Sequence, residues 1–114
     1  MRRYRAGWNT GVTTVYISVG NSDNKLAQTS WSSYCLDVDR AFEAAVRYEG
    51  ARVHGRWFSL PNEPWQNACW CAEWHDDLAH VVEAFKRALA TIARSYGQES
   101  IAWAVAETEF LGPV

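Results

Sequence analysis

The hydrophobic pattern of this 114-residue chain predicts six segments in the order strand, helix, strand, strand, helix, strand. Apolar residues recur every three or four positions over residues 29–48 and again over 77–96, which predicts two amphipathic helices. Residues 13–19 alternate between apolar and polar side chains, as a half-buried strand does. Each helix has one apolar stripe, so both need a sheet to pack against.

Two further strands are predicted over residues 52–60 and 67–74, on either side of a loop at 61–64 (PNEP). Prolines at both ends of this loop favour a hairpin, and residues 101–110 form the last predicted strand. The simplest packing of this order is a four-stranded antiparallel sheet with two helices on one face. With right-handed crossovers, it is a ferredoxin-like βαββαβ sandwich of the α+β class.

Length and composition predict a single α+β domain over residues 12–114. A chain of this size with 48% hydrophobic residues can bury one core. Residues 1–11 fit no element and contain three arginines, so we expect a flexible basic N-terminal arm. No apolar run is long enough to cross a membrane, and the first residues lack the apolar segment of a signal peptide. These features predict a cytoplasmic protein that does not enter a membrane.

The cysteines raise the question of a metal site. Three cysteines cannot all be paired within one chain, so free thiols are expected. Cys69, Cys71 and His75, together with His54 on the neighbouring strand, carry atoms that bind zinc. Their spacing matches no common zinc motif, and alternate residues of a strand do not converge on one point. We therefore predict neither a metal nor a cofactor, while zinc binding by these residues stays open.

Charge argues against a nucleic-acid partner. The net charge of −2 and the pI of about 5.9 do not suit a protein that neutralises phosphates. Residues 15–21 resemble the first-strand motif of RNA-recognition modules, where an aromatic residue such as Tyr16 stacks on a base. The companion motif would lie at residues 66–73 (QNACWCAE), which lack its basic residue and its glycine. Nucleic-acid binding is therefore not expected.

The seven tryptophans predict an interface. In this architecture one sheet face carries no helix, and neither face of the predicted strands is reliably polar. We expect that face to carry Tyr16, Trp57 or its neighbour Phe58, and Trp70 or Trp103. A large apolar surface is rarely left in water, and a two-fold contact needs only one self-complementary patch. The chain is thus predicted to form a homo-oligomer, with a dimer as the first choice, although a partner protein, a flat ligand or internal packing with the N-terminal arm would also cover these rings.

Polar residues are predicted to gather at one edge of the sheet, where they form a candidate ligand site. Residues 20–25 (GNSDNK) precede the first helix, and a helix N-terminus favours an anion. The ligand is expected to be small and nucleotide-like. Ordinary turn chemistry requires the same residue types. The predicted ligand-binding residues are Asn21, Asp23, Lys25, Glu63, Trp65, Gln66 and Asn67.

An enzyme is the alternative interpretation, although no catalytic residue is predicted. Asp23 and Glu63 resemble the carboxylates of cyclase and polymerase palm domains, which would imply a divalent-metal-dependent phosphoryl-transfer or hydrolytic enzyme using Lys25 as well. Those sites use closely spaced acidic residues, which the PNEP loop lacks. Residues 53–58 (VHGRWF) resemble the phosphate loop of acylphosphatases, but they lie in the second predicted strand and not after the first. A non-enzymatic binding module is therefore preferred.

Three segments carry a resemblance to known proteins. Residues 19–26 (VGNSDNKL), 64–71 (PWQNACWC) and 109–113 (EFLGP) resemble short uncharacterised proteins of Streptomyces and related actinobacteria, their phages and mobile elements. The resemblance covers the chain from about residue 12. It implies an intracellular accessory role of the kind found in conflict between phage and host, and it assigns no activity and no catalytic residue.

Overall fold

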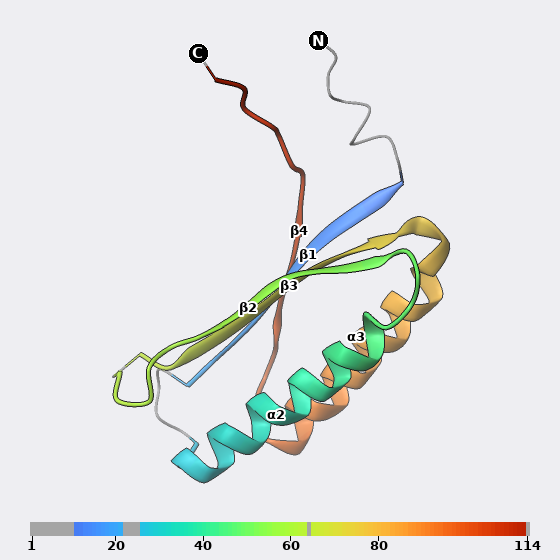
Figure 1. The fold of residues 1–114 in the computed structure, drawn as a ribbon. Coiled ribbons are helices and arrows are strands. Elements are labelled where there is room, and N and C mark those ends of the chain that lie inside the picture. Colours follow the sequence, from blue (N-terminus) through green and yellow to red (C-terminus); the bar gives the residue numbers. More distant parts are fainter. Residues whose placement is uncertain (1–10, 22–25, 64, 114) are drawn as a thin grey trace.

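The computed structural model describes residues 11–21, 26–63 and 65–113 as an α+β sandwich (Figure 1). A four-stranded antiparallel sheet with the order β2-β3-β1-β4 carries two α-helices on one face, so the predicted ferredoxin-like arrangement is confirmed. Most of the predicted N-terminal arm, residues 1–10, lies outside the described residues. The elements are β1 (Val12–Gly20), α2 (Gln28–Ala45), β2 (Ala51–Phe58), β3 (Asn67–His75), a 3₁₀ turn (Asp76–Leu78), α3 (Ala79–Ser95) and β4 (Ala102–Ala106).

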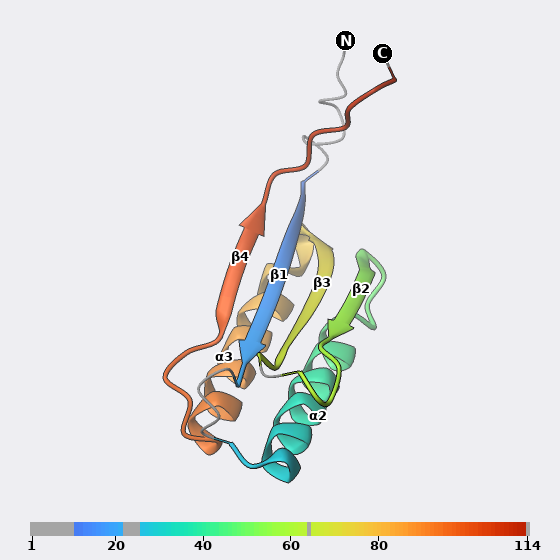
Figure 2. The ribbon, with the colours of Figure 1, turned by 90° about the vertical axis from the view of Figure 1, so that its left-hand side faces the viewer.

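The largest differences from the predicted element boundaries are at the end of α2 and in β4. Helix α2 ends at Ala45, three residues early, and the chain turns through Gly50, whose φ of 98° is left-handed and favours glycine. Strand β4 is five residues long and not ten. It pairs with β1 only from Thr14 to Ser18, and Glu107 follows, a residue type that is depleted in strands. Figure 2 shows β4 at the outer edge of the sheet, beside β1.

The core lies between the sheet and the two helices. On β1, the side chains of Val15, Ile17 and Val19 are buried, as the alternation predicts. Phe85 of α3 packs against both Phe42 of α2 and a strand tryptophan, with ring centroids about 6 Å apart. Burial of each such large side chain contributes about 1.5–3 kcal/mol. This single layer of packing holds both helices on the same sheet face, which we call the helix face.

Two buried indoles on β3 are satisfied by groups of α2. The Nε1–H of Trp70 donates to Oδ1 of Asp39 at 2.9 Å, and the Nε1–H of Trp74 donates to the carbonyl of Ala45 at 2.8 Å. Asp39 also accepts from Arg56 of β2 at 2.7 Å. Because buried donors are costly to leave unpaired, these bonds fix the register between α2 and the sheet. Within the described ranges, no helix is long and apolar enough to cross a membrane.

Candidate functional site

A buried amide cluster occupies the predicted ligand edge. Asn21 and Gln66 are 3% and 5% exposed, and the Nδ2–H of Asn21 donates to Oε1 of Gln66 at 3.1 Å. Gln66 also exchanges two hydrogen bonds with Gln28, of 2.9 and 2.7 Å, and donates to the carbonyl of Pro61 at 3.2 Å. Both donors and both lone pairs of the Gln66 amide are thereby used within the chain.

Asn21 uses its side chain in the same way. Its Oδ1 accepts from the N–H of Leu26 and its Nδ2–H donates to the carbonyl of Leu26, both at 3.0 Å. The cluster therefore joins β1, the start of α2 and the β2–β3 hairpin. This placement argues against direct ligand contact by Asn21 and Gln66, because their polar groups face one another and not the solvent. Sequence reasoning had not included Gln28, which is the first residue of α2 and lies just outside the helix predicted from residue 29.

The other predicted ligand residues are not part of this buried cluster. Asp23 and Lys25 lie outside the described residues. Glu63 is exposed in the hairpin loop, and its backbone N–H donates to the carbonyl of Leu60 at 3.0 Å. Trp65 is exposed too, and the Nδ2–H of Asn67 donates to its carbonyl at 3.0 Å. The described part of this edge thus offers exposed side chains around a closed amide cluster.

The face of the sheet without helices, which we call the open face, has two aromatic side chains near its middle. Tyr16 of β1 lies opposite Cys71 of β3, and Cys71 lies opposite Gly55 of β2. The ring of Trp57 lies over Gly55, where a Cβ would approach ring carbons to 3.2 Å. Tyr16 and Trp57 are 41% and 53% exposed, while Cys71 is buried between them. These two rings flank a buried thiol.

The Tyr16 hydroxyl and the Cys71 thiol are both weakly acidic groups. A hydrogen bond with Cys71 raises the pKa of Tyr16, and burial raises the pKa of the Cys71 thiol. Both groups therefore stay protonated at neutral pH. Cys69, next on the same face, accepts a hydrogen bond from the hydroxyl of Ser18 at 3.5 Å. The buried Cys71 thiol is therefore suited to packing and not to nucleophilic attack, which requires a thiolate.

The prediction that Trp70 or Trp103 lies on the open face is wrong for both residues. Trp70 is fully buried under α2. Trp103 of β4 packs edge-to-face on Phe85 of α3 at 5.8 Å, so it also lies on the helix face. Of Trp57 and Phe58, it is Trp57 that lies on the open face, because a β-bulge between Val53 and Gly55 reverses the alternation of β2.

The open face is also more polar than predicted. On β1, Tyr16 lies between the polar residues Thr14 and Ser18, and the residues of β4 opposite these three are small alanines (Ala106, Ala104 and Ala102). At its β2 side, Nε2 of His54 lies 2.7 Å from Oε1 of Glu73. The face therefore has an aromatic centre and a polar surround. Within the described ranges, no group of three or more His, Cys, Asp or Glu residues is placed to hold a metal ion.

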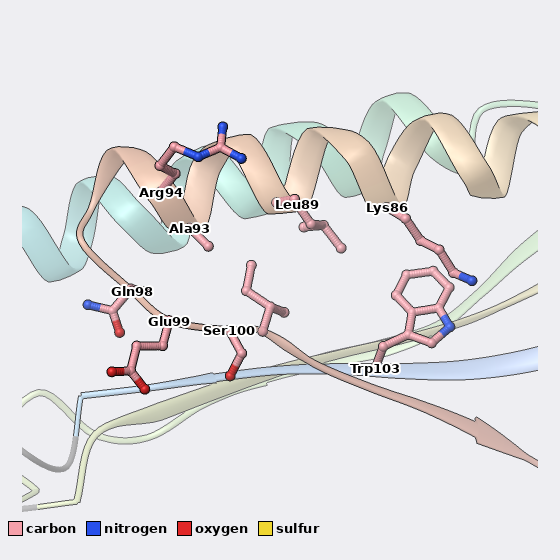
Figure 3. A pocket seen from close by; sticks show the side chains of 10 residues that line it. Lys86, Leu89, Ala93, Arg94, Gln98, Glu99, Ser100 and Trp103 are labelled. Atoms are coloured by element: carbon pink, nitrogen blue, oxygen red, sulfur yellow. The ribbon is translucent and has the colours of Figure 1, made fainter.

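A groove that the sequence analysis did not predict lies between α3 and β4 (Figure 3). The groove, of about 510 Å³, has Leu89 and Ala93 of α3 on one wall and Ile101 and Trp103 on the other. A smaller hollow of about 230 Å³ extends it along β4 past Val105. Nζ of Lys86 lies 5.1 Å from the centroid of the Trp103 ring, where the two hollows meet. The signal in the sequence was β4 itself, with bulky residues alternating with alanines.

Comparison with known proteins shows a likeness of fold alone. No family model and no curated protein matches the chain in sequence. Hydantoinase/carbamoylase family amidases from Burkholderia ambifaria and Burkholderia vietnamiensis contain a similar arrangement, at 12% and 18% identity and a TM-score of 0.47 for each. The matches cover 83% and 90% of this chain but only 26% and 28% of those amidases. A protein of unknown function from Rhodopseudomonas palustris matches over 96% of this chain and 90% of its own length, at 16% identity and a TM-score of 0.48.

Proposed function

We propose that the chain is a small, non-enzymatic interaction module that binds a partner protein through its open face. The observation that carries the proposal is the pair of exposed rings, Tyr16 and Trp57, on either side of the buried Cys71. Tyrosine and tryptophan are the residue types that most often contribute the main binding energy at protein interfaces. A polar surround is the usual rim of such a patch.

The rings are held in place before a partner arrives. Trp57 lies against the backbone at Gly55, where no side chain separates the ring from the strand. Tyr16 lies directly opposite Cys71 on the neighbouring strand β3. Binding through side chains that are already ordered loses less conformational entropy, so the same contact area gives a higher affinity.

The polar groups of the open face favour a protein over a phosphate-bearing ligand. His54 pairs with Glu73, and the carboxylate of Glu73 would repel a phosphate placed beside it. The free thiols of Cys35, Cys69 and Cys71 support a reducing compartment, which we take to be the cytoplasm. The resemblance to short proteins of Streptomyces, their phages and mobile elements supports an accessory role in such an element.

The test compares complexes recovered from a Streptomyces host that expresses the tagged chain, measured by native mass spectrometry. We expect the wild type to retain a protein of defined mass, and Tyr16→Ala and Trp57→Ala to lose it. Tyr48→Ala is the matched control, because Tyr48 is 44% exposed, close to the 41% of Tyr16, but lies in the α2–β2 connection. The recovered protein must then bind the purified wild type, with the same order of affinities among the variants.

Two results would overturn the proposal. If a small molecule and no protein is retained, the chain is a ligand-binding protein and the amide-rich edge becomes the site to test. If the Tyr16 and Trp57 variants bind the partner as well as Tyr48→Ala does, the open face is not the contact surface. Circular dichroism of each variant separates loss of binding from loss of fold.

A further inference from the structure

We propose that two copies of this chain pair through the outer edge of β4 and form a two-fold dimer with a continuous sheet. No described strand pairs with that edge, and the strand sequence Ala-Trp-Ala-Val-Ala contains no charge and no proline. The opposite edge strand, β2, has a bulge at Val53/Gly55 and carries Arg52 and Arg56. Bulges and charges prevent strand pairing, whereas a flat apolar edge promotes it.

The sequence of β4 is complementary to itself. In an antiparallel pair, residues opposite each other have the same hydrogen-bonding orientation, so a two-fold axis between two copies of one strand must lie midway between the two copies of a single residue. An axis at Ala104 gives the longest overlap. It places Trp103 opposite Val105 of the second copy on the helix face, and Ala102 opposite Ala106 of the second copy on the open face. A large side chain meets a medium one, and alanine meets alanine.

The charges beside β4 are complementary under the same axis. Lys86 lies over Trp103, and Glu83 borders the hollow that Val105 also lines. When Trp103 faces Val105 of the second copy, Lys86 therefore faces Glu83 of the second copy. The symmetry repeats this pair, so two ion pairs form across the α3 helices. Within one copy, Lys86 and Glu83 are already 3.4 Å apart, and the dimer joins these pairs into a network of four charges.

The position of the groove between α3 and β4 also favours a second copy of the chain as the partner. Its apolar wall, which includes Leu89, Ile101 and Trp103, opens beside the β4 edge, where the second copy would lie. A pairing of one short strand and one helix face is near the lower end of stable interfaces, which bury about 1,200 Å² or more. We therefore expect a reversible dimer with a micromolar dissociation constant. This contact lies on the opposite sheet edge from β2, so it holds or fails independently of the proposed function.

The first test is sedimentation velocity of the purified chain over a range of concentrations. Val105→Lys places a charge opposite Trp103 of the second copy, and Val105 is 64% exposed, so the monomer should tolerate the change. We expect the dissociation constant to rise by about tenfold or more, as for a central interface residue. Val53→Lys is the matched control, because it makes the same substitution at an exposed valine of the other edge strand. Its dissociation constant should stay within about twofold of the wild-type value.

A charge exchange provides a second test that does not depend on one variant. Lys86→Glu and Glu83→Lys should each weaken the dimer, because each places like charges opposite one another across the axis. The double variant restores opposite charges both within and between copies, so it should recover most of the wild-type affinity. A monomer at all concentrations would overturn the proposal. So would equal effects of Val105→Lys and Val53→Lys, a double variant no better than the single ones, or a dimer that is lost in Trp57→Ala.

Discussion

Replacement of Asn21 by alanine tests whether the amide cluster serves folding or ligand binding. Asn21 is 3% exposed, and its side chain makes three hydrogen bonds of 3.0 to 3.1 Å with Leu26 and Gln66. The substitution removes all three bonds and leaves the N–H and carbonyl of Leu26 without these partners. The backbone N–H of residue 21 can still donate to the carbonyl of Gln66, at 2.8 Å in the wild type, so the strand end itself is preserved.

The expected loss follows from these bonds. A buried hydrogen bond contributes about 1 kcal/mol net, and leaving a buried partner unsatisfied costs more, so Asn21→Ala should lower the free energy of unfolding by about 2–3 kcal/mol. For a domain of this size, such a loss lowers the melting temperature by about 10 °C or more. If the cluster binds no ligand, the decrease in the free energy of unfolding should be the same whether or not cell extract, as a source of ligands, is added.

Urea denaturation followed by circular dichroism measures this loss. The matched control is Asn67→Ala, because Asn67 is an exposed asparagine in the same region with one side-chain hydrogen bond, to the carbonyl of Trp65. Its effect should stay below about 0.5 kcal/mol, as is usual for surface substitutions. The reasoning is refuted if the two variants lose the same stability, or if Asn21→Ala is as stable as the wild type but loses a bound ligand.

Three further outcomes follow from the core and its titrating groups. Asp39→Ala should cost about 2–3 kcal/mol in urea denaturation, since it leaves the buried indole N–H of Trp70 without its acceptor; Asp39→Asn, which keeps an acceptor, should cost less. Burial raises the pKa of Tyr34 from 10.0 to about 12, so between pH 10 and 12 the unfolded phenol ionises first and stability falls. In the wild type, the free energy of unfolding should fall by up to about 1.4 kcal/mol per pH unit in this range. Denaturation curves of Tyr34→Phe should lack this part of the fall. Iodoacetamide at pH 8 should label the half-buried Cys69 before Cys71, whose pKa is raised by burial, as peptide mass spectrometry would show.

Periodicity was sufficient to predict the order of the elements and the packing of the helices. The three-and-four spacing marked the buried stripe of α2, including Trp31, Tyr34 and Phe42, and the stripe of α3 with Val81 and Phe85. These residues have an unambiguous period because polar residues separate them. Two one-sided helices and four strands then leave few arrangements, so the sheet order follows from connection rules.

Periodicity was insufficient where both faces of a strand are apolar. In β3, Trp70 and Cys71 are both fully buried, one on each face, so alternation could not decide which side carries the tryptophan. In β2, the bulge shifts the phase at Val53/Gly55, and a bulge leaves no reliable mark in a single sequence. The ligand edge failed for another reason. Asn21 and Gln66 are polar, and their burial depends on partners distant in sequence.

The two edges of the sheet differ in whether another strand can pair with them, and this difference connects the proposed dimer with the proposed binding of a partner protein. β2 is linked to α2 through Arg56, which pairs with Asp39 and Glu43, and its bulge interrupts the ladder, so this edge is closed to strand addition. β4 has neither protection. Pairing there would extend the sheet to eight strands, with both open faces on the same side. Because strands are about 4.8 Å apart, the two Tyr16 side chains would then lie about 14 Å apart, across three strand spacings.

That separation makes the binding of a partner depend on dimerisation in a measurable way. Two equivalent surfaces on one rigid sheet bind an immobilised partner with a higher apparent affinity than one surface does, without any new contact. Val105→Lys should therefore lower the apparent affinity for a densely immobilised partner by about tenfold or more, while it leaves binding to the same partner in solution unchanged. A variant that loses both kinds of binding equally would show that β4 contacts the partner directly, and a variant that loses neither would show that the dimer has no part in binding.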